Sequence, residues 1–216
     1  MGLCKCIRCP QQGNYVVGKY YGWLYAIEEV NNGKKGFRVS DESGSRYRFL
    51  PEEYLLYFKD IVMADISMEI YIDRKRDLVF LPAFKHEAGY HVNLDIFEQL
   101  SYPYTSEDVG RIFFDMWEEH RNHPIVNAED VERVTPYYKI ITNGKEYKAF
   151  SGKRWMIYIT FVLSENEIII EYWYRKKSGF GRDITDKNID RIVKLSSDNM
   201  TVGNAILEVF EEAGVP

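Results

Sequence analysis

The pattern of apolar and polar positions predicts two similar amphipathic helices, near residues 100–120 and 195–214. In both segments a Val-Gly pair precedes apolar and acidic positions, an aromatic residue and Glu-Glu. The pairs are Val109-Gly110 and Val202-Gly203. At 100° per residue, each segment gathers its apolar side chains on one arc and its acidic side chains on the opposite arc. This self-similarity predicts a repeated architecture.

The segments before each helix repeat as well. Apolar runs flank a polar turn at 73–77 and another at 164–167, and one more short run follows each pair. The expected strands are 68–72, 78–85 and 96–100 in the first copy and 156–163, 168–175 and 191–195 in the second. Residues 61–65 read as a connecting strand. We therefore expect residues 61–216 to be a duplicated β-β-β-α domain, with copies at about 66–123 and 153–216.

The helix boundaries and the link between the copies are also readable. The expected N-caps are Thr105 or Ser106 for the first helix and Ser197 or Asp198 for the second. Gly110 and Gly203 lie at the edge of the apolar arcs, where a missing side chain would let each helix approach the sheet closely. Between the copies, residues 128–134 have helical character, and 137–141 with the turn Asn143-Gly144 suggest a hairpin.

Residues 15–60 read as short strands with tight turns. Asn31-Asn32-Gly33 is a hairpin signal, and 41–44 is a second turn between alternating runs that begin at 36 and 45. Strands this short are protected best in a closed sheet. The G-K-x-Y start at Gly18 and the stretch DESGSRYRFLPEEY resemble a small SH3-like barrel. The fold class is thus α+β: an SH3-like β-barrel at 1–60, with 52–58 adding a helical turn, followed by the duplicated domain.

Composition is that of a globular protein, with 45% apolar and 28% charged residues among 216. The 17 tyrosines suit β-sheets, the reading we favour, or an aromatic binding surface. No signal peptide, membrane span or spread disulfide framework is visible, so a reduced cytoplasm is expected.

Charge is uneven. The chain carries −5, but residues 1–60 hold nine Lys and Arg against seven Asp and Glu, so the remainder carries −7. This balance disfavours nucleic acid as a ligand there and favours a basic protein. A solvated helix face explains the acidic arcs most simply; a docking surface for a basic partner is the alternative. The candidate binding residues are Asp115, Glu118, Glu119, Glu208, Glu211 and Glu212.

Residue patterns for metal, phosphate or catalytic chemistry are weak. Cys4, Cys6 and Cys9 lack a fourth zinc ligand nearby and suit a strand or a frayed terminus. His120 and His123 have metal-compatible spacing, but a helix end suits histidine equally well. The glycine-rich segment 179–183 lacks a following helix for phosphate, and a plain loop is favoured.

Catalysis is not indicated either. His86 and His91 lack a nucleophile pattern, and a surface role is favoured for both. No hydrolase, zinc-protease or nucleotide-binding signature is present. We expect no catalysis and no cofactor.

The last seventy residues resemble the immunity proteins of bacterial contact-dependent growth inhibition, the CdiI group. The matching features are the Tyr147-Lys148 stretch with Lys153 and Met156, a β-hairpin, a loop with Gly179, a strand at 192–195, the acidic and Ser run 196–198, and a helix that opens Val202-Gly203-Asn204-Ala205. Asn199 stands where the group usually has a proline.

The resemblance implies a cytoplasmic, non-catalytic protein that binds the toxic C-terminal domain of a rival's effector, often a nuclease, and blocks its active site. The appended barrel departs from that group. The alternative hypothesis is an adaptor of a phage or regulatory complex that recognises a peptide or protein through the aromatic residues at 15–58. Neither hypothesis involves nucleic acid or a membrane.

Overall fold

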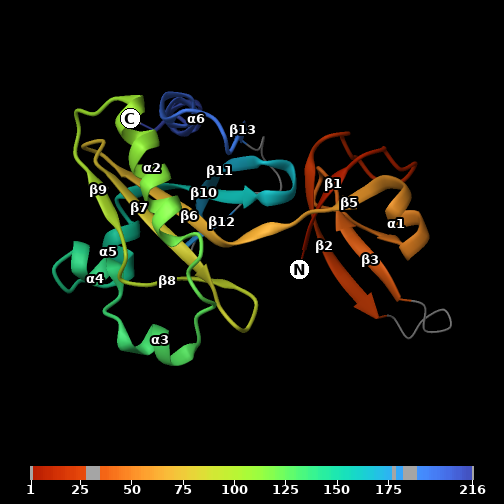
Figure 1. Ribbon diagram of the computed structural model, residues 1–216, viewed down its shortest axis with the longest axis horizontal. Helices are drawn as coiled ribbons and strands as arrows, with labels where there is room; N and C mark the ends of the chain where they lie inside the picture. The colour runs from red at the N-terminus through yellow and green to blue at the C-terminus, as the bar shows by residue number, and fades with distance from the viewer. Residues whose placement is uncertain (1, 28–34, 177–178, 182–188, 216) are drawn as a thin grey trace. The chain divides into compact units, whose positions relative to one another are not determined.

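The protein is described by a computed structural model that covers residues 2–27, 35–176, 179–181 and 189–215 (Figure 1). The chain forms two compact units. The first contains the chain up to Met63 together with the short segment Leu163–Glu165, and the second contains Ala64–Val162 and most of the chain from Asn166 onward. The fold class is α+β, as expected, with two β-sheets.

The first unit is built on a five-stranded antiparallel sheet in the order β4-β3-β2-β1-β5. Its elements are β1 (Gly2–Cys6), β2 (Tyr20–Ile27), β3 (Lys35–Ser40), β4 (Arg46–Phe49), α1 (Pro51–Tyr57) and β5 (Phe58–Asp60). The turn at 41–44 and the helical turn near 52–58 are confirmed. The expected Asn31-Asn32-Gly33 hairpin lies outside the described residues. Residues 16–19 form a turn rather than the start of a strand.

Aromatic side chains fill the core of this unit. The ring of Tyr15 lies 5.2 Å from that of Phe58 and 5.0 Å from that of Tyr21, both edge-on. Tyr54 is fully buried and stacks on Phe37 at 4.1 Å. Rings in edge-on and stacked pairs contribute packing energy beyond the area they bury. The tyrosine excess therefore serves the sheet core here.

The second unit contains one eight-stranded sheet whose main path is β12-β11-β10-β6-β7-β8. Two hairpins, β6 (Met63–Asp73) with β7 (Leu78–Lys85) and β10 (Arg154–Val162) with β11 (Glu167–Lys176), join through their first strands, β6 and β10. The two expected copies thus share one sheet. Strand β6 begins at Met63, so the expected connecting strand is continuous with it.

Each hairpin is extended in the same manner. In the first half, β7 also pairs with β8 (His91–Asn93) and β9 (Glu98–Leu100), and α2 (Ser106–His120) follows. In the second half, β11 also pairs with β12 (Gly179–Gly181) and β13 (Asp190–Lys194), and α6 (Asn199–Glu212) follows. Strands β8 and β12 were not expected; the favoured loop at 179–181 is a strand instead.

Helices α2 and α6 pack against each other through their glycines. A Cβ atom on Gly110 would lie 1.8 Å from the backbone oxygen of Asn199, and one on Gly203 would lie 1.8 Å from the oxygen of Ser106. The expected close approach is therefore real, but it occurs between the helices rather than between helix and sheet. Both helices then bury apolar side chains, such as Phe113 and Ile206, in one core with the sheet.

The segment between α2 and β10 differs from the expectation. Helical character was expected at 128–134, and helix α3 (Ala128–Arg133) confirms it. The expected hairpin at 137–144 is wrong. Two short helices, α4 (Tyr137–Ile141) and α5 (Tyr147–Ser151), stand there. Asn143 and Gly144 both have positive φ, at 54° and 84°, and the N–H of Gly144 bonds to the oxygen of Lys139. The Asn-Gly pair thus ends a helix. Helix ends and hairpin turns both place residues in the left-handed backbone conformation, so the pair suits either structure.

These short helices cover the second face of the sheet. Tyr137 and Phe150 are buried there against Tyr71, Val79 and Leu81, forming a core separate from that under α2 and α6. Figure 1 shows α4 and α5 beside the sheet and away from α6. Because side chains alternate along a strand, β6 contributes to both cores. The unit therefore has helices against both faces of its sheet.

Candidate protein-binding surfaces

The six candidate acidic residues all lie exposed on α2 and α6. On α2 they are partly neutralised by neighbours: Asp115 lies 3.6 Å from Arg111, and Glu118 lies 3.1 Å from Arg121. Exposed pairs of this kind contribute little to stability, but they reduce the local negative potential. The acidic arc of α2 is thus less negative than its sequence suggests.

The acidic arc of α6 is held by one arginine from the sheet. Arg191, on β13, reaches Glu212 at 2.5 Å and Glu208 at 3.6 Å. These contacts with Glu212 and Glu208 raise the pKa of the Arg191 guanidinium. The carboxylate of Glu211 forms no ion pair among the described residues.

The histidines take packing positions. His123 lies against Phe84 at 4.1 Å between ring centroids, and burial lowers the pKa of the neighbouring His120. His86 is buried and stacks on Tyr90 at 4.6 Å, with its Nδ1 accepting the N–H of Ala88. The surface role expected for His86 is therefore wrong, although His91 is exposed as expected.

The cysteine group belongs to the first strand. Cys4 and Cys6 are buried on β1, and Cys9 is exposed beyond it. Burial raises the pKa of Cys4 to about 12 and that of Cys6 to about 11, which opposes the thiolate form that zinc requires. Within the ranges that the structure covers, no group of three or more metal-ligating side chains is present. The strand interpretation is the one that fits.

A buried carboxyl on the second face of the sheet was missed in the sequence. Glu69, on β6, accepts a hydrogen bond from the hydroxyl of Tyr71 at 2.8 Å. Its side chain keeps some solvent exposure, yet the carboxyl lies deep enough that burial raises its pKa to about 7. Nearby, Tyr158 donates to Ser67 at 2.7 Å and stacks on Trp173. Only the alternation Ser67-x-Glu69-x-Tyr71 could have indicated a polar row here.

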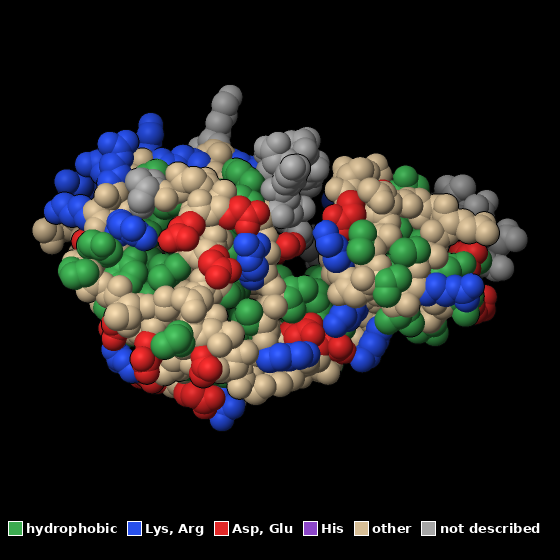
Figure 2. All heavy atoms as spheres, turned by 90° about the horizontal axis from the view of Figure 1, so that it is seen from above, with side chains coloured by type: hydrophobic (Ala, Val, Ile, Leu, Met, Phe, Trp, Pro, Cys, Tyr) green, Lys and Arg blue, Asp and Glu red, His purple; other side chains and the backbone are tan. Residues whose placement is uncertain are grey.

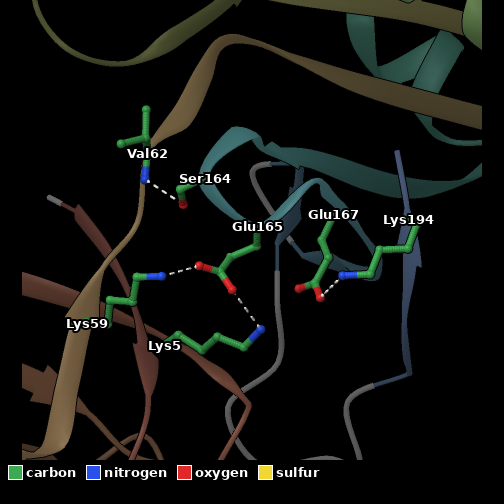
Figure 3. Close-up of polar contacts among 7 residues, drawn as sticks. All are labelled: Lys5, Lys59, Val62, Ser164, Glu165, Glu167 and Lys194. Carbon is green, nitrogen blue, oxygen red and sulfur yellow. Dashed lines mark hydrogen bonds and ion pairs between the residues drawn. The ribbon is translucent and has the colours of Figure 1, made fainter. Parts of the chain in front are cut away.

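Polar contacts anchor the turn between β10 and β11, which contains the 3₁₀ turn Leu163–Glu165 and belongs to the first unit (Figure 3). Glu165 lies 2.7 Å from the ammonium of Lys59 and 3.4 Å from that of Lys5. The N–H of Val62 donates to the hydroxyl of Ser164 at 3.3 Å. Hydrogen bonds from Lys59 and Lys5 lower the pKa of Glu165. The carboxylate of Glu165 thus holds two cations of the first unit.

The first unit also has a shallow cavity of about 300 Å³. The lining residues are Pro10, Gln11, Gln12, Phe49, Glu53 and Tyr57. Most aromatic residues that could have recognised a peptide, such as Tyr15 and Tyr54, are core residues instead. The cavity is therefore one part of this unit that remains available to a ligand.

Comparison with known proteins points to the fold alone. No model of a known protein family and no curated protein matches the chain. The fold is similar to that of a protein of unknown function from Neisseria meningitidis, with a TM-score of 0.50 and 11% identity over 68% of this chain and 93% of that one. It is also similar to a chain of the CdiA-CT/CdiI toxin and immunity complex from Yersinia pseudotuberculosis, with a TM-score of 0.50 and 12% identity over 69% of this chain and 98% of that one. In the parts that the structure describes, no helix is long and apolar enough to cross a membrane.

Proposed function

We propose that this protein is an immunity protein that binds and neutralises a cognate bacterial toxin domain, of the kind delivered in contact-dependent growth inhibition. The observation that carries the proposal is the likeness to a chain of a toxin and immunity complex, which extends over nearly all of that chain. The features at 147–205 that resemble the CdiI group support it independently. The target would be a nuclease domain, its active site would be occluded, and the encounter would take place in the cytoplasm.

The order of strands and helices supports two further parts of the proposal. The two halves of the second unit share hairpin, extra strands and helix in the same sequence, as a duplication would produce. The five-stranded sheet of the first unit is proposed to be an SH3-like module, with its boundary near residue 60. Neither part is needed for toxin binding.

We assign the toxin contacts to the acidic residues of α2 and α6. A nuclease that holds a polyanionic substrate presents a cationic surface, and complementary charge accelerates association. Glu211 and Glu212 suit a test because both are exposed at the end of α6. Replacing both by lysine should slow association with the toxin and weaken its salt dependence.

The test begins with the gene next to this one. The toxin domain encoded there is expressed with and without this protein, and growth and co-purification are measured. Protection with a stable one-to-one complex is expected. Absence of both protection and co-purification would rule out the immunity function. Wild-type protection with unchanged kinetics for the Glu211→Lys, Glu212→Lys variant would reject only the acidic surface.

The cavity of the first unit supports an alternative, an adaptor that recognises a protein or peptide through that unit. Its lining combines Phe49 and Tyr57 with the carboxylate of Glu53. If the adaptor hypothesis holds, Tyr57→Ala abolishes binding of the partner while Glu211→Lys does not. The same pair of variants therefore separates the two functions.

A further inference from the structure

Seven cationic side chains gather at one end of the sheet in the second unit, and we call them the basic patch. They come from the β6–β7 turn, the segment from α5 into β10, and the end of β11. The basic patch consists of Arg74, Lys75, Arg76, Lys148, Lys153, Arg154 and Arg175. Figure 2 shows Lys and Arg side chains gathered at one end of this unit. The acidic groups within the same segments are Asp73 and Asp77.

Hydrogen bonds join the end of β11 to the segment from α5 into β10. The guanidinium of Arg175 donates to the backbone oxygen of Gly152 at 2.6 Å and also to that of Arg154. Arg154 donates to the oxygen of Phe150 at 3.1 Å. The charges of Asp73 and Asp77 act on the pKa of Arg154, which burial lowers, so the β6–β7 turn lies beside it. The cations are therefore positioned by the fold.

Across the described ranges, none of the seven members of the basic patch forms an ion pair, and the Nε atoms of Arg76 and Arg154 are buried without a hydrogen-bond partner. The carboxylates of Asp73 and Asp77 are instead engaged by backbone N–H groups, including that of Tyr102. This contrasts with the acidic helices, where Arg111, Arg121 and Arg191 pair with carboxylates.

Aromatic rings lie next to the arginines. Arg76 lies over the ring of Tyr102 at 5.3 Å, and Arg175 lies over that of Phe180 at 5.6 Å. Tyr102 is 51% exposed, so its ring remains available for further stacking. Cations that form no ion pair, next to an exposed aromatic ring, are the combination that binds single-stranded nucleic acids: the cations meet phosphates and the ring meets a base.

Much of the acidity of α2 lies away from this surface. The basic patch lies beside the N-terminus of α2, since the hydroxyl of Tyr104 donates to the backbone oxygen of Arg76. Of the two acidic residues in the first turn of α2, Glu107 and Asp108, the latter binds its cap Thr105 and lies 3.7 Å from Arg111. Glu118 and Glu119 lie at the other end of that helix, ~20 Å away at 1.5 Å per residue. The Debye length is about 10 Å at 0.1 M salt, so the remote carboxylates are largely screened from a ligand here.

We propose that the basic patch binds single-stranded nucleic acid through its phosphates, with Tyr102 stacking on a base. The alternative partner, an acidic segment of a protein, would use the cations but would gain nothing from an exposed ring beside them. This proposal does not depend on the immunity function: a toxin could be neutralised without it, and it could hold for an adaptor.

The test is fluorescence anisotropy of the full-length protein with a labelled single-stranded RNA 20-mer at 50 mM and 200 mM salt. The wild type should bind, and Lys148→Glu with Lys153→Glu should weaken binding at least tenfold. It should also reduce the slope of log K against log salt by about 1.4, since each lost phosphate contact contributes about 0.7. Tyr102→Ala should weaken binding while leaving the salt slope unchanged.

The matched control is Arg8→Glu with Arg46→Glu, which changes the net charge equally at exposed positions of the first unit. Circular dichroism of each variant verifies its fold. Absence of wild-type binding at 50 mM salt overturns the proposal, as does equal loss in the control. Tighter binding of a poly-glutamate peptide than of RNA overturns it in favour of an acidic protein partner.

Discussion

The close crossing of α2 and α6 predicts that a Gly→Ala change at the crossing destabilises the protein, although the same change stabilises most helices. A Gly→Ala change inside an unobstructed helix stabilises a protein by about 1 kcal/mol, because alanine has the better helix propensity. At Gly203 the new Cβ would lie 1.8 Å from the oxygen of Ser106 and 3.0 Å from the nitrogen of Gly110. Both obstacles are backbone atoms, so no side chain can rotate to make room.

The two helices would therefore have to separate by about 1 Å or more, which is overpacking, a change that costs about 1–3 kcal/mol even when side chains can adjust. Separation also loosens the buried contacts of Val109, Val202 and Ile206 in the shared core. We expect Gly203→Ala to destabilise the second unit by about 2 kcal/mol net of the propensity gain. With a urea slope of about 2 kcal/mol per molar, the midpoint should fall by about 1 M.

The assay is urea unfolding followed by circular dichroism at 222 nm, which reports chiefly on the two longest helices, α2 and α6. Asn204→Ala is the matched control, since this neighbouring residue is exposed and the change should be slightly stabilising. A midpoint for Gly203→Ala at or above that of the wild type would refute the glycine-to-backbone crossing.

Three further changes test charges and caps. Because burial raises the pKa of Glu69 to about 7, this carboxyl ionises at lower pH in the unfolded chain than in the folded protein, and the free energy of unfolding declines between about pH 4.5 and 7. Glu69→Gln should remove this decline, and a pH profile of the urea midpoint equal to that of the wild type would contradict the prediction. Glu165→Gln should cost ~0.5 kcal/mol at pH 7, where Lys59 pairs with the carboxylate, and the cost should shrink as the pH falls through the lowered pKa of Glu165, because the stability that the ionised carboxylate contributes is lost there; a cost that does not change with pH would contradict this. Thr105→Ala should cost about 1 kcal/mol by removing the cap that bonds the N–H of Asp108, measurable in the thermal midpoint, and Thr105→Ser should restore most of it.

Local sequence signals predicted much of the second unit well. The strand at 78–85 and the N-cap choices at Thr105 and Asp198 match the structure because a short apolar run and a capping residue are both local signals. The role of Gly110 and Gly203 in helix-to-helix packing could not be predicted. A glycine on an apolar arc indicates that another element packs closely there, but it does not identify that element. The partner lies about 90 residues away in the chain.

Local sequence signals gave a wrong prediction where the same pair of residues suits either a hairpin turn or a helix end. Asn143 and Gly144 adopt the left-handed conformation that a hairpin turn would also need, and only the burial of Tyr137 and Phe150 on the sheet decides for helices. Net charge failed in a different way. The −7 of residues 61–216 averages over acidic helices and the basic patch, which come from distant segments and are separated only by folding.

The joining of the two hairpins through β6 and β10 has a consequence for synthesis on the ribosome. About 80 residues separate the end of β6 from the start of β10. At about 5–20 residues per second, the nascent chain spends roughly 4–16 s with the edge of β6 unpaired. During that time its N–H and C=O groups can pair with another chain. A translational pause before residue 154 should therefore promote aggregation, while pauses that occur after β10 has emerged from the ribosome should have little effect.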